Sequence, residues 1–91
     1  MFTDIDYNTK MGKSLKMLEA YDKDNDVYVK ITESDNIQLL KNIGIALWKN
    51  FNLSRKDNRE PIDWLQISDS NTEQRICFLD EKDNKLFWMA S

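Results

Sequence analysis

Hydrophobic and polar residues alternate in residues 27–32, VYVKIT, where Val27, Val29 and Ile31 are separated by more polar residues. A period of two is typical of a strand with one buried face. The preceding segment, residues 14–21, has apolar residues at spacings that fit a helix or a strand equally well. The pattern therefore predicts a strand from residue 27 and leaves the segment before it open.

Residues 34–52 change to a helical period, in which apolar residues and a glycine recur every three or four positions. The recurring positions are Ile37, Leu40, Gly44, Leu47 and Phe51. Ser34 is the predicted N-cap, and Thr32 with Asp35 has the spacing of a capping box. One long helix is predicted here.

The middle of this helix, NIGIALW, is apolar on more than one face. Ile45 and Trp48 widen the apolar stripe beyond what covering one sheet requires. Two interpretations remain open at this point. The stripe is either a wide core face in a small domain, or a surface where Ile45 and Trp48 contact a second copy in a homodimer.

Three further segments, residues 62–68, 74–80 and 85–90, are short and rich in aromatic and β-branched residues. Asp, Asn and Ser between them favour turns, so these segments are predicted strands, and the last two should form an antiparallel hairpin. Apolar residues occupy both parities of the last two segments, which indicates two partly covered faces and again an interface.

The predicted elements combine into one domain over residues 1–91. Its fold class is α+β, in the order ββαβββ. We expect an antiparallel five-stranded sheet with one long helix packed across one face.

Composition argues against several classes of function. The formal net charge of -3 and the pI near 4.8 argue against direct nucleic-acid binding. The chain has no His, and its two glycines cannot build a phosphate-binding loop, so we expect neither an enzyme nor a bound cofactor. The single cysteine, Cys77, lies in an apolar run and is expected to be buried and inert.

The sequence also indicates location and origin. It shows neither a signal peptide nor an apolar run that could span a bilayer, so we expect a cytoplasmic protein without a membrane partner. Lys outnumbers Arg, and Asn, Ile and Asp are frequent, as AT-rich codons favour. A low-GC bacterium, or a phage or mobile element within one, is the expected source.

One segment has candidate metal chemistry. DKDNDVYVKITE, residues 22–33, resembles the calcium loops of calmodulin-type EF-hand proteins, because Asp22, Asp24, Asp26 and Glu33 match acidic positions of that loop. Val27, however, stands where those loops need a glycine at positive φ. The segment is therefore interpreted as a hairpin turn that holds no metal, with a calcium-binding module as the alternative.

A second resemblance covers residues 27–52, VYVKITESDNIQLLKNIGIALWKNFN, where a strand passes through a polar segment directly into a helix. This run is similar to small phage-encoded anti-CRISPR inhibitors, and the whole chain has the size and acidity of phage anti-restriction proteins that imitate DNA. The resemblance implies a non-enzymatic inhibitor that presents carboxylates to the basic nucleic-acid-binding surface of a host or defence protein. The candidate partner-binding residues lie in two expected acidic turns: Asp22, Asp24, Asp26, Asp80, Glu81 and Asp83.

Overall fold

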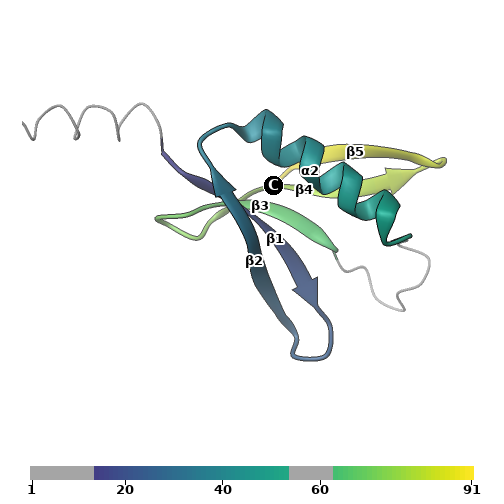
Figure 1. Cartoon of the computed structure of the whole chain (residues 1–91), viewed down its shortest axis with the longest axis horizontal. Helices are drawn as coiled ribbons and strands as arrows, with labels where there is room; N and C mark the ends of the chain where they lie inside the picture. The colour runs from purple at the N-terminus through teal and green to yellow at the C-terminus, as the bar shows by residue number, and fades with distance from the viewer. Residues whose placement is uncertain (1–13, 54–62) are drawn as a thin grey trace, which may run out of the picture.

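The computed structural model describes residues 14–53 and 63–91, which fold in the predicted order ββαβββ (Figure 1). The segment that the sequence left open, residues 14–21, forms most of the first strand. The elements are β1 (Lys16–Asp22), β2 (Val27–Ser34), α2 (Ile37–Asn50), β3 (Leu65–Asp69), β4 (Arg75–Lys82) and β5 (Lys85–Ala90).

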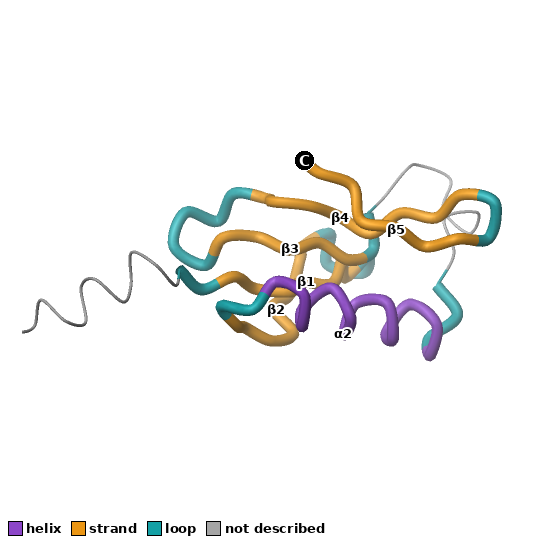
Figure 2. The backbone as a smooth tube through the Cα atoms, turned by 90° about the horizontal axis from the view of Figure 1, so that it is seen from above, coloured by secondary structure: helices purple, strands orange, loops and turns teal. Residues whose placement is uncertain are grey.

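The strands form one five-stranded sheet in the order β2-β1-β3-β4-β5, and all neighbouring strands are antiparallel. The chain leaves the sheet at one edge after β2, passes through α2, and returns beside β1 as β3. α2 lies along one side of the sheet, as the view from above shows (Figure 2). The β1–β2 hairpin extends away from α2 (Figure 1). This architecture confirms the predicted α+β class.

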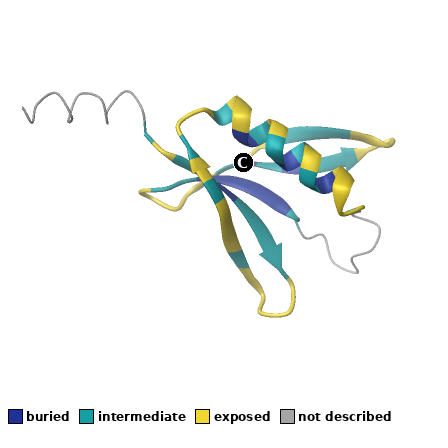
Figure 3. Cartoon of the chain, viewed as in Figure 1, coloured by how far each residue is buried: buried dark blue, intermediate teal, exposed yellow. Residues whose placement is uncertain are grey.

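The core lies between α2 and the sheet, where burial is concentrated (Figure 3). Two clusters of buried side chains form it: Leu18, Leu40, Ile67 and Cys77 in one, and Trp48, Leu65 and Leu79 in the other. Every strand from β1 to β4 except the edge strand β2 contributes to these clusters. The core therefore joins α2 to the middle of the sheet and leaves the outer strand largely uncovered.

The N-cap of α2 is Asn36, and the prediction of Ser34 was wrong. The Asn36 side chain accepts a hydrogen bond from the backbone N–H of Leu39 at 3.1 Å. Ser34 is the last residue of β2, and its hydroxyl accepts a hydrogen bond from the Asn36 N–H at 3.0 Å. Because Asn and Ser are about equally good N-caps, the longer strand decides where the helix begins.

A β-bulge interrupts β2. Leu18 pairs with Thr32, whereas the next residue, Glu19, pairs with Lys30, which leaves Ile31 as an extra residue on the edge strand. The bulge places Lys30 and Glu33 on the same face, and their side chains form an ion pair at 3.8 Å. The simple alternation predicted for this strand therefore ends at Ile31.

The strand boundaries after α2 differ in part from the predictions. β5 has the predicted bounds, and β4 runs two residues further, to Lys82. Trp64 lies in a bend and β3 begins only at Leu65, while residue 62 lies outside the described residues. The two-residue turn between β4 and β5 has positive φ at Asp83 and Asn84, as a type I′ hairpin requires.

Gly44 allows α2 to approach the sheet closely. A Cβ atom at this position would lie 2.6 Å from Cζ2 of Trp88 and 3.5 Å from Leu18. We expect Gly44→Ala to lower the free energy of unfolding by about 1 to 2 kcal/mol, because overpacking outweighs the gain of about 1 kcal/mol in helix propensity. Asn42→Ala, on the exposed side of the same helix, gains propensity without a clash and loses only the exposed hydrogen bond from Gln38 at 3.1 Å, so it should not destabilise the chain. Urea unfolding of both variants tests this, and an equal response would contradict it.

Candidate binding groove and acidic turn

An apolar groove of about 260 Å³ opens between the C-terminal end of α2, the β1–β2 hairpin and the start of β3. We call this cavity the groove. Its wall comes from segments that are far apart in the sequence. The lining residues are Ala20, Tyr21, Ile31, Leu47, Phe51, Leu53, Trp64 and Leu65.

The groove exists because α2 ends before it covers the hairpin. The helix stops at Asn50, and the backbone N–H groups of Phe51 and Leu53 donate to Leu47 and Trp48 of the last turn. This arrangement places Phe51 outside the helix proper, with 70% of its surface exposed. A large aromatic side chain is thus held at the rim of an apolar cavity.

The edge strand continues the apolar surface. Val27 and Val29 pair with Asp22 and Ala20 and are each 49% exposed, and Ile31, brought to the groove by the bulge, is 43% exposed. We call Val27, Val29 and Ile31 the apolar strip. In a half-covered strand these three positions would normally be the buried ones. Here the sequence pattern is correct, but the described residues do not cover this face.

The acidic turn, residues 22–26, joins β1 to β2. Asp22 organises it: Oδ1 accepts hydrogen bonds from the N–H groups of Asp24 and Asn25 at 3.0 and 3.4 Å, and Oδ2 accepts from Nδ2 of Asn25 at 2.8 Å. The hydrogen bond from the Asn25 side chain is the main reason that the pKa of Asp22 lies below its ordinary value. Asp26 has φ 56°, and its Oδ1 accepts the hydroxyl proton of Tyr21 at 2.6 Å.

The acidic turn and the groove meet at the end of β1. Ala20 and Tyr21 both border the groove. The Tyr21 ring, on the same face as Tyr28 and away from α2, donates its hydroxyl proton to Asp26 of the turn. Asp22 stands two residues beyond Ala20 on the same strand face, which is about 7 Å along an extended chain. Carboxylates therefore stand at one end of an apolar cavity. This combination is the candidate site.

The EF-hand alternative requires Glu33 to join the acids of the turn. Residues 22–33 instead form a strand end, a turn and a strand, which confirms the predicted hairpin. Glu33 lies near the far end of β2, paired with Met17, and is seven positions beyond Asp26, which is roughly 20 Å along an extended strand. Within residues 14–53 and 63–91, no group of three or more His, Cys, Asp or Glu side chains is arranged to hold a metal ion.

The second predicted acidic turn is only partly a turn. Asp80 and Glu81 lie inside β4, paired with Phe87 and Leu86, and Asp83 alone is in the β4–β5 turn. Asp80 accepts a hydrogen bond from the N–H of Glu81 at 2.8 Å. The turn between β4 and β5 and the acidic turn lie at different ends of the molecule (Figure 1). The structure therefore brings Asp22, Asp24 and Asp26 together but does not join Asp80, Glu81 and Asp83 to them.

The predicted self-association surface also needs correction. Trp48 is 3% exposed and belongs to a core cluster, so it is not available for contact with another chain. Ile45 is partly buried and packs against the same cluster. The wide apolar stripe is thus a core face, which was the other interpretation.

The other face of β4, which the sequence predicts to be partly covered, is covered in part by Arg75. Its guanidinium lies 4.7 Å from the ring centre of Phe78.

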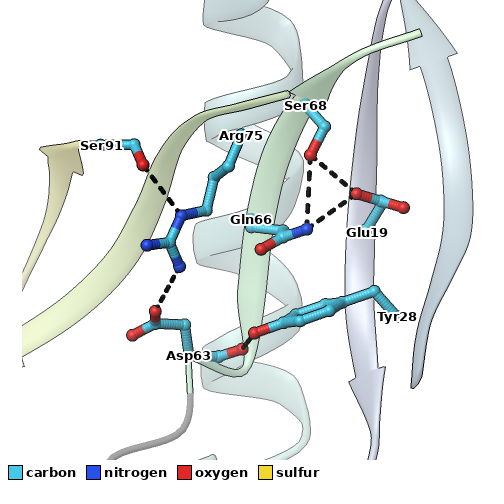
Figure 4. Close-up of polar contacts among 7 residues, drawn as sticks. All are labelled: Glu19, Tyr28, Asp63, Gln66, Ser68, Arg75 and Ser91. Atoms are coloured by element: carbon cyan, nitrogen blue, oxygen red, sulfur yellow. Dashed lines mark hydrogen bonds and ion pairs between the residues drawn. The ribbon is translucent and has the colours of Figure 1, made fainter. Parts of the chain in front are cut away.

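The sheet face away from α2 carries a polar network that the sequence did not predict (Figure 4). Oε1 of Glu19 accepts hydrogen bonds from Gln66 Nε2 at 2.9 Å and Ser68 Oγ at 2.8 Å. Ser68 is fully buried and Gln66 is 9% exposed. Beside it, Arg75 donates to Asp63 at 2.6 Å and to Ser91 at 3.0 Å. All members have hydrogen-bond partners within the chain, so the network stabilises the sheet.

Cys77 is buried, as expected. Burial raises the pKa of its thiol, and the charge of Lys41 opposes this only in part.

No helix in residues 14–53 and 63–91 is long and apolar enough to cross a membrane, and α2 has only 14 residues.

Comparison of the chain with protein-family models, curated proteins and solved structures gave no match. The resemblance to anti-CRISPR and anti-restriction proteins therefore stays a prediction.

The hydrogen bond between Tyr21 and Asp26 gives a pH-dependent prediction. The Asp26 carboxylate is the main reason that the pKa of Tyr21 is raised from 10.0 to about 12. Because the folded pKa exceeds the unfolded one, this contribution to stability is complete below about pH 10 and is lost as the pH rises through 12. Asp26→Asn should return the pKa of Tyr21 toward 10, as measured by NMR titration of its ring carbon. Asp24→Asn removes the same charge without this hydrogen bond, and an equal decrease in that variant would contradict the assignment.

Proposed function

We propose that this chain is a non-catalytic protein-binding module that holds its partner against the groove and the acidic turn. The observation that carries the proposal is the groove itself, an apolar cavity extended by the exposed apolar strip and Phe51. Contiguous exposed apolar surface on a small protein marks an interaction site far more often than isolated apolar residues do.

The charge beside the groove indicates the class of partner. Asp22, Asp24 and Asp26 outnumber Lys23 in the acidic turn, and the whole chain has a net charge of -3. A partner with a basic surface complements this end of the molecule. We propose a nucleic-acid-handling host or defence protein, which the module would inhibit by occupying the surface that otherwise holds phosphates.

Binding is favoured over catalysis by the nature of the wall. Of the described residues that line the groove, only Tyr21 has an ionisable side chain, and its pKa of about 12 lies far above neutral pH. An acid or base for proton transfer should instead have a pKa near the working pH. The groove thus offers shape and apolar contact, which are what a stoichiometric inhibitor uses.

Selection from a library of displayed short random peptides tests this proposal, because the library contains every combination of charged and apolar side chains. Peptides enriched on the native chain should carry Lys or Arg together with large apolar residues, and their affinity should fall as salt rises. Asp24→Asn should weaken the best peptide about two- to fivefold. Asp83→Asn removes the same charge from the other turn and should have no effect. Enrichment of acidic peptides, or equal effects of the two variants, would contradict the proposal.

A further inference from the structure

The size of the groove limits what it can hold. Pockets for cofactors and drug-sized ligands have volumes of roughly 300 to 1,000 Å³. The groove, at about 260 Å³, lies below that range and is open along the apolar strip. A cavity of this size fits one large side chain delivered by a longer polypeptide lying across it. The occupant is therefore an anchor residue.

The wall favours an aromatic anchor. Phe51 and Trp64 both line the groove, and Phe51 is 70% exposed at its rim. Aromatic rings prefer offset or edge-on contacts with other rings, and these contribute beyond the burial of area. An aromatic ring in the groove would meet aromatic edges and the aliphatic side chains of Leu47 and Leu53.

Charge argues against a second copy as the occupant. A copy that inserted its own exposed Phe51 into the groove in a two-fold dimer would bring two acidic turns toward one another. Like charges facing each other across an interface oppose association. A cation beside the anchor, in contrast, would meet Asp22 on the groove face and Asp24 at the exposed tip of the turn.

We infer that the groove binds an aromatic side chain that stands next to a Lys or Arg on the partner protein. This inference rests on the proposed function and specifies the partner's chemistry. The apolar wall selects the ring, and the acidic turn selects the sign of the neighbouring charge. A matched aromatic residue next to Asp or Glu should be rejected by the same carboxylates.

Two small probes of nearly equal shape test this inference: phenethylammonium, an aromatic cation, and phenylacetate, an aromatic anion. In methyl and amide NMR titrations, the cation should shift the signals of Ile31, Leu47 and Leu53 together with those of the acidic turn, with a dissociation constant in the millimolar range. The anion should bind about three- to tenfold more weakly. Asp24→Lys should reduce this difference, and Asp83→Lys, at the distant turn, should leave it unchanged.

Several outcomes would overturn the inference. Equal binding of the two probes would remove the role of charge, and cation-induced shifts confined to another surface would remove the groove. Groove signals that change with protein concentration alone would identify a second copy as the occupant. If enriched peptides bind the acidic turn while neither probe perturbs the groove, the inference fails and the proposed function stands. If no basic peptide is enriched either, both fail.

Discussion

Leu40→Ala should lower the free energy of unfolding by about 3 to 5 kcal/mol. Leu40 has no exposed surface and belongs to the core cluster between α2 and the sheet, so truncation loses burial and leaves a cavity. A domain of this size has a total stability of roughly 5 to 10 kcal/mol, so this single change should remove a large part of it. Urea unfolding monitored by tryptophan fluorescence measures the loss.

The neighbouring residue provides the control for this prediction. Leu39 is on the same helix but is 47% exposed, so Leu39→Ala should cost less than about 1 kcal/mol. A similar loss in both variants would mean that α2 does not face the sheet as described. A smaller loss for Leu40→Ala than for Leu39→Ala would reverse the assignment of the buried face.

The second large effect concerns the buried polar network on the other side of the sheet. Glu19→Ala should lower the free energy of unfolding by about 2 to 3 kcal/mol, because it removes the acceptor for Gln66 Nε2 and Ser68 Oγ. Both donor side chains are buried, so water cannot replace the lost acceptor. Glu19→Gln keeps an acceptor oxygen and should recover part of the loss.

Glu33→Ala is the matched control for this network. Glu33 is on the same face but exposed, and its ion pair with Lys30 at 3.8 Å is of the kind that contributes less than about 1 kcal/mol. Equal losses for Glu19→Ala and Glu33→Ala would show that the network adds nothing beyond surface charge. Full stability of Glu19→Ala would contradict the burial of its partners.

Much of the fold could be predicted from local patterns. The period of two in β2, the helical spacing of α2 and the β-rich segments after residue 64 each identify an element correctly. The ends of elements were predicted less accurately where a capping signal and strand pairing compete for the same residues. Ser34 looks like an N-cap, but the pairing of β2 with β1 extends to that residue and moves the cap to Asn36. Pairing between distant strands is not visible in a local pattern.

The bulge at Ile31 and the burial of Trp48 have the same explanation. A bulge is recognised only from the register of two strands, here the step from Leu18 to Glu19 against β2. In the helix alone, Trp48 exceeds what one apolar face needs. Its partners in the second core cluster, Leu65 and Leu79, come from strands later in the sequence, so a local pattern does not show that Trp48 is buried. Whether an apolar residue is core or interface depends on what the rest of the chain brings to it.

Of the candidate site, the acidic turn could be predicted from the sequence and the groove could not. Asp, Lys and Asn at residues 22–26 identify a polar turn directly, because such residues favour turns chemically. The groove was not predicted, since its wall joins β1, β2, the end of α2 and the start of β3. The nearest signal was the surplus of apolar residues. The surplus predicted at Ile45 and Trp48 on α2 belongs to the core, whereas the exposed apolar side chains beside the groove are in β2 and at Phe51.

The most direct test of the binding account is the affinity of the best selected peptide for Phe51→Ser, compared with Leu39→Ser, by isothermal titration calorimetry. Both variants remove an exposed apolar side chain from α2 or its end, but only Phe51 lines the groove. If the groove is the binding site, Phe51→Ser should weaken binding about 30-fold, the loss of a typical aromatic anchor contact of about 2 kcal/mol, and Leu39→Ser should leave it within twofold. Unchanged affinity for Phe51→Ser, or an equal loss for Leu39→Ser, would contradict the account.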